Sequence, residues 1–353
     1  MATQETQILD DIIVSSRRRL LSLGAASLAG LVLASSTRSA KAAVAYTDDD
    51  ILNFALNLEY LEANFYYLAA FGCTIDKPNA AAMNAGAPAA GIPITGSVGT
   101  AGTVTGGSQV PFSTIQVGSY AVETAIEEGK HVLTLQAALG SVAVAQPAIN
   151  LAGGTGGSFG ELAQAAGITS DQSFSPYAAD ADFLIGAYVF EDVGVTAYHG
   201  AASLLTGTTT TLPVAAGILG VEAYHAGLVR TTLNYLDPTG SLGLVGYTTK
   251  VSALRATLSN QALLGATPAA SAYDNQPDDY GLAPATFTLP TGSVTGTRIV
   301  DADPTDVVAF ARSTTQVLNI VTGGGAIKNG AVVSPATGIF FPAGLNAGAN
   351  GFK

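Results

Sequence analysis

The sequence has few of the residues on which most protein chemistries depend. Among its 353 residues there is one cysteine, there are three histidines, and tryptophan is absent. A single cysteine excludes an internal disulfide framework and any zinc site built from several cysteines. Lysine and arginine number 14 against 26 aspartates and glutamates, and this acidic balance argues against nucleic acid as a partner. Because histidine is so scarce, a histidine placed beside a glutamate is informative.

Charge is also scarce, at 11% of residues, whereas 48% are hydrophobic. This composition is too apolar for intrinsic disorder, and the length suits one large domain or two. The apolar stretch near the N-terminus, residues 20–34, is shorter than the roughly 20 residues that cross a bilayer.

An export signal is predicted for residues 1–42. Ser16-Arg17-Arg18-Arg19-Leu20-Leu21 precedes the apolar stretch, and Ala40-Lys41-Ala42 follows it as an A-x-A-like cleavage site. This order resembles a twin-arginine (Tat) signal peptide. We therefore expect export to the periplasm, the cell envelope or the medium, with no stable membrane span after cleavage. An uncleaved N-terminal membrane anchor is the alternative.

The predicted signal bears on function, because the Tat route carries folded proteins, often with a cofactor already bound. Cleavage after Ala42 would remove five basic and three acidic residues. The mature chain would then be more acidic, and a cation is the natural small partner of such a surface.

Helical periodicity predicts a bundle over residues 46–236 and an extension over 237–353. The four long helices of the bundle are expected at 48–71, 114–139, 178–205 and 212–236, with a long loop at 72–112. A short helix is expected near 161–166. In the extension, two short helices at 248–261 and 303–321 are expected to pack on the bundle, with loop or short strands over 267–300.

Most of the glutamate lies on these four helices. Eight glutamates follow residue 42, and seven of them fall on the predicted long helices, together with all three histidines. The same helices contain only Lys130 and Arg230 as basic residues. Acidic side chains on apolar helices without basic partners need another cation, and a metal ion is the simplest.

The spacing of these residues indicates two metal ions. Glu128 and His131, and likewise Glu222 and His225, are three positions apart, so each pair projects from one helix face. The other two helices offer Glu59 and Glu191, each followed seven residues later by a tyrosine, Tyr66 and Tyr198. A glutamate from each of two helices and Glu-x-x-His from each of two others is the ligand pattern of di-metal carboxylate bundles.

The chain resembles the ferritin-like superfamily, and in particular the ferritin-like-domain proteins that include plant desiccation-related proteins. The resemblance rests on residues 56–66 (LNLEYLEANFY), Glu127-Glu128-x-x-His131, Glu222-Ala223-Tyr224-His225, residues 310–318 (FARSTTQVL) and residues 340–346 (FFPAGLN). It implies an all-α four-helix bundle with a mostly irregular C-terminal extension. It also implies two Fe or Mn ions held by Glu59, Glu128, His131, Glu191, Glu222 and His225.

Several assignments stay open at this point. Glu62 lies one turn after Glu59 and is either an alternative ligand or a proton relay, and Glu127 is an alternative to Glu128. His199 is either a second-shell partner of the metal site or a core histidine with its own hydrogen bonds. Tyr66 and Tyr198 are read more readily as core packing than as redox relays.

Three functions fit the sequence. The first is an exported di-metal oxidoreductase that consumes oxygen or peroxide in stress or desiccation protection. The second is a non-enzymatic stress-protective protein whose metal site only stabilises the bundle, and the third is a metal-binding protein of the envelope. The expected partners are metal ions, oxygen or peroxide, and a second copy of the chain in a homodimer. The long loop and the C-terminal extension argue against a large multi-subunit iron cage.

Overall fold

A computed structural model of the chain describes residues 46–259, 279–303, 307–323, 327–328, 331–332 and 338–347. The predicted export signal lies outside these ranges. So do residues 260–261, at the predicted end of a helix, residues 267–278 of the predicted loop-or-strand segment, and residues 304–306 of the last predicted helix.

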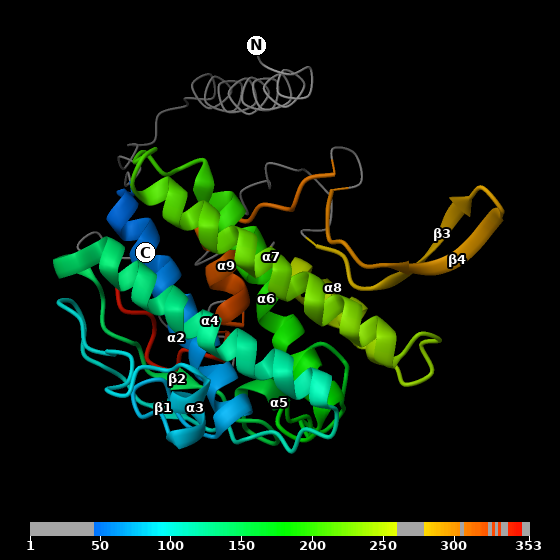
Figure 1. Cartoon of the computed structure of the whole chain (residues 1–353), viewed down its shortest axis with the longest axis horizontal. Helices are drawn as coiled ribbons and strands as arrows, with labels where there is room; N and C mark the ends of the chain where they lie inside the picture. The colour runs from blue at the N-terminus through cyan, green and yellow to red at the C-terminus, as the bar shows by residue number, and fades with distance from the viewer. Residues whose placement is uncertain are drawn as a thin grey trace, which may run out of the picture. The chain divides into compact units, whose positions relative to one another are not determined.

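Four long helices form the bundle (Figure 1): α2 (Asp48–Phe71), α4 (Ile115–Leu139), α6 (Asp180–Ala202) and α7 (Thr211–Leu236). Helix α2 packs mainly against α4, and α6 packs mainly against α7. In the first pair, Tyr60 meets Gln136 near the end of α4, whereas Asn53 reaches Val142 beyond it. The two helices are therefore antiparallel, and the bundle predicted from periodicity is confirmed.

Helix α6 also runs opposite to α2, because Phe65 stacks on Phe183 while the later residue Tyr198 bonds to the earlier residue Glu59. Helices α4 and α6 therefore run in the same direction. Their connection has to return along the length of the bundle, which is the single long crossover of ferritin-like bundles. It contains the short helices η1 (Gly140–Val142) and α5 (Ser158–Ala165).

Helix α2 is the most enclosed element, and its ends are set by local chemistry. Thr47 and Asp50 form a reciprocal capping box at the N-terminus, and Gly72 ends the helix with φ of 70°. Twenty of its 24 residues are buried. An ordinary bundle helix buries one face, whereas α2 is also covered by the C-terminal extension.

The long loop after α2 contains a little regular structure. Helix α3 (Ala80–Ala85) follows Asn79, whose side chain caps it. Strand β1 (Val104–Thr105) pairs in parallel with β2 (Ile149–Asn150) from the crossover connection. These contacts tie the two irregular connections together at one side of the bundle.

The C-terminal region contains α8 (Leu244–Ser259), the hairpin β3 (Ala283–Leu289) and β4 (Gly292–Arg298), α9 (Thr314–Val321), and the short strands β5 (Ile327–Lys328) and β6 (Ala331–Val332). Helix α8 begins four residues earlier than predicted, because the Asp237 carboxylate accepts from the amides of Leu242 and Leu244. The hairpin extends away from the helices (Figure 1), and its side chains are mostly exposed.

The prediction of a helix from Asp303 is wrong. Helix α9 begins only at Thr314, where Ser313 and Gln316 form a capping box. Just before it, the Arg312 amide donates to the carbonyl of Thr196 in α6, so the backbone there is extended along the bundle. Phe310 is buried, and its carbonyl oxygen lies 3.1 Å from Nδ1 of His199 in α6, so the residues just before Arg312 contact the bundle without forming a helix.

Aromatic side chains attach the tail to the bundle core. Phe340 packs against Phe159 of α5 and Phe190 of α6, with ring centroids 5.3 Å and 5.1 Å apart. Phe340 and Phe341 are both buried. The Phe-Phe-Pro segment therefore packs the tail against the bundle.

A buried chain of ion pairs also fixes the extension. Asp192 of α6 accepts from Arg230 of α7 and Arg255 of α8, each at 3.0 Å. Asp279 then joins Arg255 (2.9 Å) to Arg312 (2.7 Å) before α9. Because each charge in this chain has an opposite charge in contact, the extension can cover α2 and α6 without an unpaired buried ion.

Among the described residues, α7 is the one helix long and apolar enough to span a membrane. It carries the buried side chains of Glu222, His225 and Arg230 and packs against α6 and α4. These contacts are those of a bundle helix.

Candidate metal centre

Six buried side chains from the four long helices converge at the centre of the bundle. Helices α2 and α6 each contribute one glutamate, and α4 and α7 each contribute a Glu-x-x-His pair. The six are Glu59, Glu128, His131, Glu191, Glu222 and His225, and none is more than 7% exposed. The structure therefore brings together every residue of the predicted ligand set.

The first of two clusters surrounds the Nδ1 atom of His131. This atom lies 3.3 Å from Oε2 of Glu59, 3.4 Å from Oε1 of Glu222 and 3.5 Å from Oε2 of Glu128. The four donor atoms come from three helices and lie within 4.8 Å of one another. That separation is the size of a single ion's coordination shell.

The second cluster surrounds the Nδ1 atom of His225. It lies 2.9 Å from Oε1 of Glu128 and 3.5 Å from Oε2 of Glu191. Glu128 thus belongs to both clusters, with Oε2 facing His131 and Oε1 facing His225. A carboxylate that offers one oxygen to each of two clusters has the geometry of a ligand that bridges two ions.

The atoms that face the two clusters lack other partners. Buried donor atoms without a hydrogen bond include both carboxylate oxygens of Glu128 and of Glu222, one oxygen each of Glu59 and Glu191, and Nδ1 of His131 and of His225. Burying such groups unpaired is costly. Four ionised carboxylates carry the charge that two divalent cations would balance, so these residues fit a pair of such ions.

The remaining oxygens of the two single glutamates are held by tyrosines on the opposite helix. Tyr66 of α2 donates to Oε1 of Glu191 in α6, and Tyr198 of α6 donates to Oε1 of Glu59 in α2. All four side chains are buried. Each tyrosine thereby orients a carboxylate so that its other oxygen points into a cluster. Both tyrosines belong to the packed core, as the sequence suggested, and in addition each donates a hydrogen bond to a proposed ligand.

Glu127 has a different place from Glu128. Its Oε2 atom lies 2.8 Å from Nε2 of His225, on the side of the ring away from the cluster. The Glu127 side chain is 39% exposed. It therefore orients the imidazole and favours the tautomer with Nδ1 free for an ion, as carboxylates behind metal-bound histidines do.

Glu62 and His199 belong to neither cluster. Glu62 is buried, and burial together with the carboxylates of Glu222 and Glu128 raises its pKa well above the ordinary range. His199 is half-buried, and its Nδ1 lies 3.1 Å from the carbonyl oxygen of Phe310 in the tail. Its role is a contact between α6 and the extension.

One contributor to the centre was not predicted. Gly194 of α6 lies against Glu222, and a Cβ atom there would collide with Oε2 of that carboxylate. A mid-helix glycine costs roughly 1 kcal/mol relative to alanine and calls for a packing reason. Gly194, three residues after Glu191, offered that signal in the sequence.

Burial and mutual charge perturb the proton affinities of the centre. Burial raises the pKa of Glu59 to about 7 against the attraction of His131, and burial with the charge of Glu128 raises the pKa of Glu222 well above its usual range. The pKa of Glu128 is lowered, since the two histidines outweigh its burial. The pKa values of His131 and His225 are raised by the surrounding carboxylates despite burial.

The donor set narrows the choice of ion. Carboxylates suit hard cations and imidazole suits iron and other transition metals, so four carboxylates with two imidazoles fit iron or manganese. Cys73, the one thiol in the chain, is only partly buried and is not part of either cluster.

Comparison with known proteins gives two matches. The sequence model of the family described as the ferritin-like domain matches residues 47–235, which contain all six residues of the clusters. The chain is also similar to the desiccation-related protein PCC13-62 of Craterostigma plantagineum, at 29% identity over 223 residues. That alignment covers 62% of this chain and 64% of the relative, so it spans slightly less than two thirds of the relative's length. No solved structure matches significantly.

Proposed function

Because the chain belongs to the ferritin-like domain family, we propose that it is a di-metal carboxylate protein that binds two iron or two manganese ions. The ligands are Glu59, Glu128, His131, Glu191, Glu222 and His225. The observation that carries the proposal is the shared Glu128 carboxylate, whose two buried oxygens face separate clusters of otherwise unpartnered donor atoms.

The reaction that best fits such a centre is reduction of dioxygen or peroxide. When bound, two redox-active ions would supply two electrons, which a second peroxide molecule, oxidised to dioxygen, or an added reductant such as Fe(II) would restore. The chain's own residues hold the ligands in place through Tyr66, Tyr198 and Glu127, and the buried apolar surroundings exclude water. Glu62, buried close to the carboxylates and outside both clusters, is suited to hold a proton for transfer.

The biological setting follows from the N-terminal segment and the similar plant protein. The twin-arginine stretch at residues 17–19 supports export of the folded, metal-loaded protein to the periplasm, envelope or medium. The name of the plant relative supports a role in protection during drying. Removal of reactive oxygen species outside the cytoplasm would account for both the predicted export and the role in drying.

The test is consumption of hydrogen peroxide and of dioxygen by protein reconstituted with Fe(II), and separately with Mn(II). We expect turnover in the wild type and loss of at least about tenfold in Glu128→Ala. Glu123→Ala is the control, because Glu123 is exposed on the same helix. Equal turnover in wild type and Glu128→Ala would refute the site. Two bound metal ions with no turnover would instead favour a metal site that only stabilises the bundle.

A further inference from the structure

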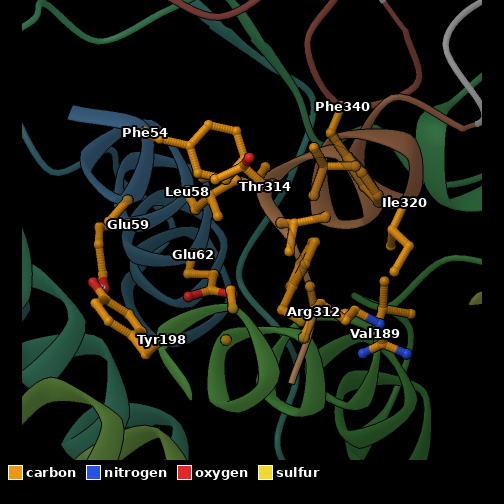
Figure 2. A pocket seen from close by; sticks show the side chains of 18 of the residues that line it. Phe54, Leu58, Glu59, Glu62, Val189, Tyr198, Arg312, Thr314, Ile320 and Phe340 are labelled. Carbon is orange, nitrogen blue, oxygen red and sulfur yellow. Dashed lines mark hydrogen bonds between the residues drawn. The ribbon is translucent and has the colours of Figure 1, made fainter. Parts of the chain in front are cut away.

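A pocket lies beside the metal centre, between the bundle helices α2 and α6 and the C-terminal helices α8 and α9 (Figure 2). The volume of this cavity is about 50 Å³. The space is therefore narrow. Its wall on α2 extends from Ile51 to Glu62, which at 1.5 Å per residue is about 16 Å.

The walls of this pocket are almost entirely aliphatic and aromatic. They include Leu61, Val193, Leu258, Val317 and Phe340, all of which are buried. The two arginines that reach the wall, Arg255 and Arg312, are held in ion pairs with Asp279. A space of this kind disfavours water and charged or sugar-like molecules, whose polar groups would lose hydrogen bonds.

One side of the pocket borders the metal centre. Glu59 and its hydrogen-bond partner Tyr198 both line it. Glu62 lies next to them in Figure 2 and is only 6% exposed. Its carboxyl group makes no hydrogen bond to any residue that the structure describes. A buried, unpartnered polar group is thus directed into an apolar space.

The outer side of the pocket is marked by small or half-buried residues. Ala55 and Leu58 of α2, Ala197 and Ala201 of α6, and Thr314 at the start of α9 are all partly exposed. Leu58 and Thr314, both labelled in Figure 2, line the pocket from α2 and α9. A ligand entering here would pass between α2 and α9 and reach Glu62 at the inner side.

We propose that this pocket binds a slender, uncharged aliphatic molecule, with its one polar group hydrogen-bonded to Glu62 beside the metal centre. The apolar walls favour an aliphatic chain, and the narrow space favours a linear molecule over a ring. Among the described residues that line the pocket, Glu62 is a carboxyl group that has no hydrogen bond and is not a proposed metal ligand. Binding of the aliphatic molecule follows from the pocket alone. Its role as a substrate of the di-metal centre rests on the proposed function.

The test uses linear alcohols from butanol to decanol as probes, titrated calorimetrically into the full-length purified protein. Burial of one methylene group contributes about 0.8 kcal/mol. Affinity should therefore rise about fourfold for each added methylene until the pocket is filled. In Glu62→Leu, the preference for octanol over octane should disappear.

Two variants place a larger side chain in the pocket and should prevent octanol from binding. Val193→Phe narrows the interior and Leu58→Trp closes the partly exposed side, and each should lower octanol affinity at least about tenfold. Leu58 is only partly buried, so Leu58→Trp is a second test of the pocket if Val193→Phe fails to fold. Val122→Phe is the matched control, since Val122 is half-buried on α4 and does not line the pocket.

The result that overturns the inference is wild-type protein that binds no alcohol, or blocked variants that bind octanol as tightly as the wild type. Metal content, measured on the same samples, tests the proposed function separately. Two metal ions without alcohol binding would overturn the pocket assignment alone. Alcohol binding without metal would uphold the pocket and overturn the di-metal function.

Discussion

The hydroxyl group of Tyr66 in α2 donates a hydrogen bond to Oε1 of Glu191 in α6, and so ties one proposed metal ligand to a different helix. Tyr198 and Glu59 repeat the same contact in the reverse direction. In both helices a tyrosine follows the glutamate by seven residues. Because α2 and α6 are antiparallel, the tyrosine of each helix reaches the glutamate of the other and donates a hydrogen bond to it. The centre is therefore held by reciprocal contacts across the bundle as well as by the ions we propose.

Removal of the Tyr66 hydroxyl should weaken metal binding without unfolding the protein. In Tyr66→Phe, Glu191 can rotate its free oxygen away from the cluster, and loss of such an orienting contact typically costs 10- to 100-fold in metal affinity. Competition with a chelator measures the affinity. Tyr60→Phe is the control, because Tyr60 lies on the same helix and bonds to Gln136 instead. Equal affinities in the two variants would contradict an orienting role.

The substitution Gly194→Ala should lower metal affinity without lowering the stability of the metal-free protein. Gly194→Ala places a Cβ atom against Glu222 and moves that ligand, so we expect metal affinity to fall at least about tenfold. The metal-free protein should nevertheless unfold at the same or a higher temperature, because alanine favours a helix by about 1 kcal/mol over glycine. Thermal denaturation with and without metal measures both effects. Unchanged metal affinity would show that Glu222 is not a ligand.

Metal affinity should fall as the pH is lowered through neutrality. The pKa of Glu59 is raised to about 7 by burial, so below that pH the carboxyl group carries a proton that an ion has to displace. Each displaced proton lowers the apparent affinity about tenfold per pH unit. Chelator competition at about pH 5.5, 6.5 and 7.5 measures this slope. If metal affinity did not change over that pH range, no carboxyl group with a raised pKa would take part in metal binding.

The buried ion pairs should control how firmly the C-terminal extension is attached. In Asp192→Asn, Arg230 and Arg255 both lose their shared partner, and breaking a buried pair costs about 3–5 kcal/mol. Chemical denaturation of the metal-free protein measures the loss. Asp182→Asn, at a half-buried position on the same helix, should change stability by about 0.5 kcal/mol or less. A similar small change in Asp192→Asn would show that the network contributes little.

The site residues that could be predicted from the sequence are those that lie close together on one helix. Glu128 with His131 and Glu222 with His225 follow from helix periodicity alone, since positions three apart share a face. The four bundle helices were predictable for the same reason, and only their ends differ by a few residues. Ser313 and Gln316 carry the capping-box pattern that marks the start of α9, but the apolar periodicity before them resembles that of a longer helix.

The features that escaped prediction depend on contacts between distant segments. Nothing in the spacing of Tyr66 shows that its hydroxyl reaches Glu191, which requires knowing that α2 and α6 are antiparallel. The ion pairs of Asp192 and Asp279 likewise join five separate segments. The choice between Glu59 and Glu62 also needed the structure, since both are buried and only Glu59 lies within reach of His131.

The most direct test of the account is the number of metal ions bound per chain, measured by elemental analysis of protein purified from its native compartment. We predict two iron or manganese ions per wild-type chain. Glu128→Ala should hold well below one, because that residue serves both clusters, and Glu123→Ala should retain two. Wild-type protein without stoichiometric metal, or Glu128→Ala with two ions still bound, would contradict the di-metal centre.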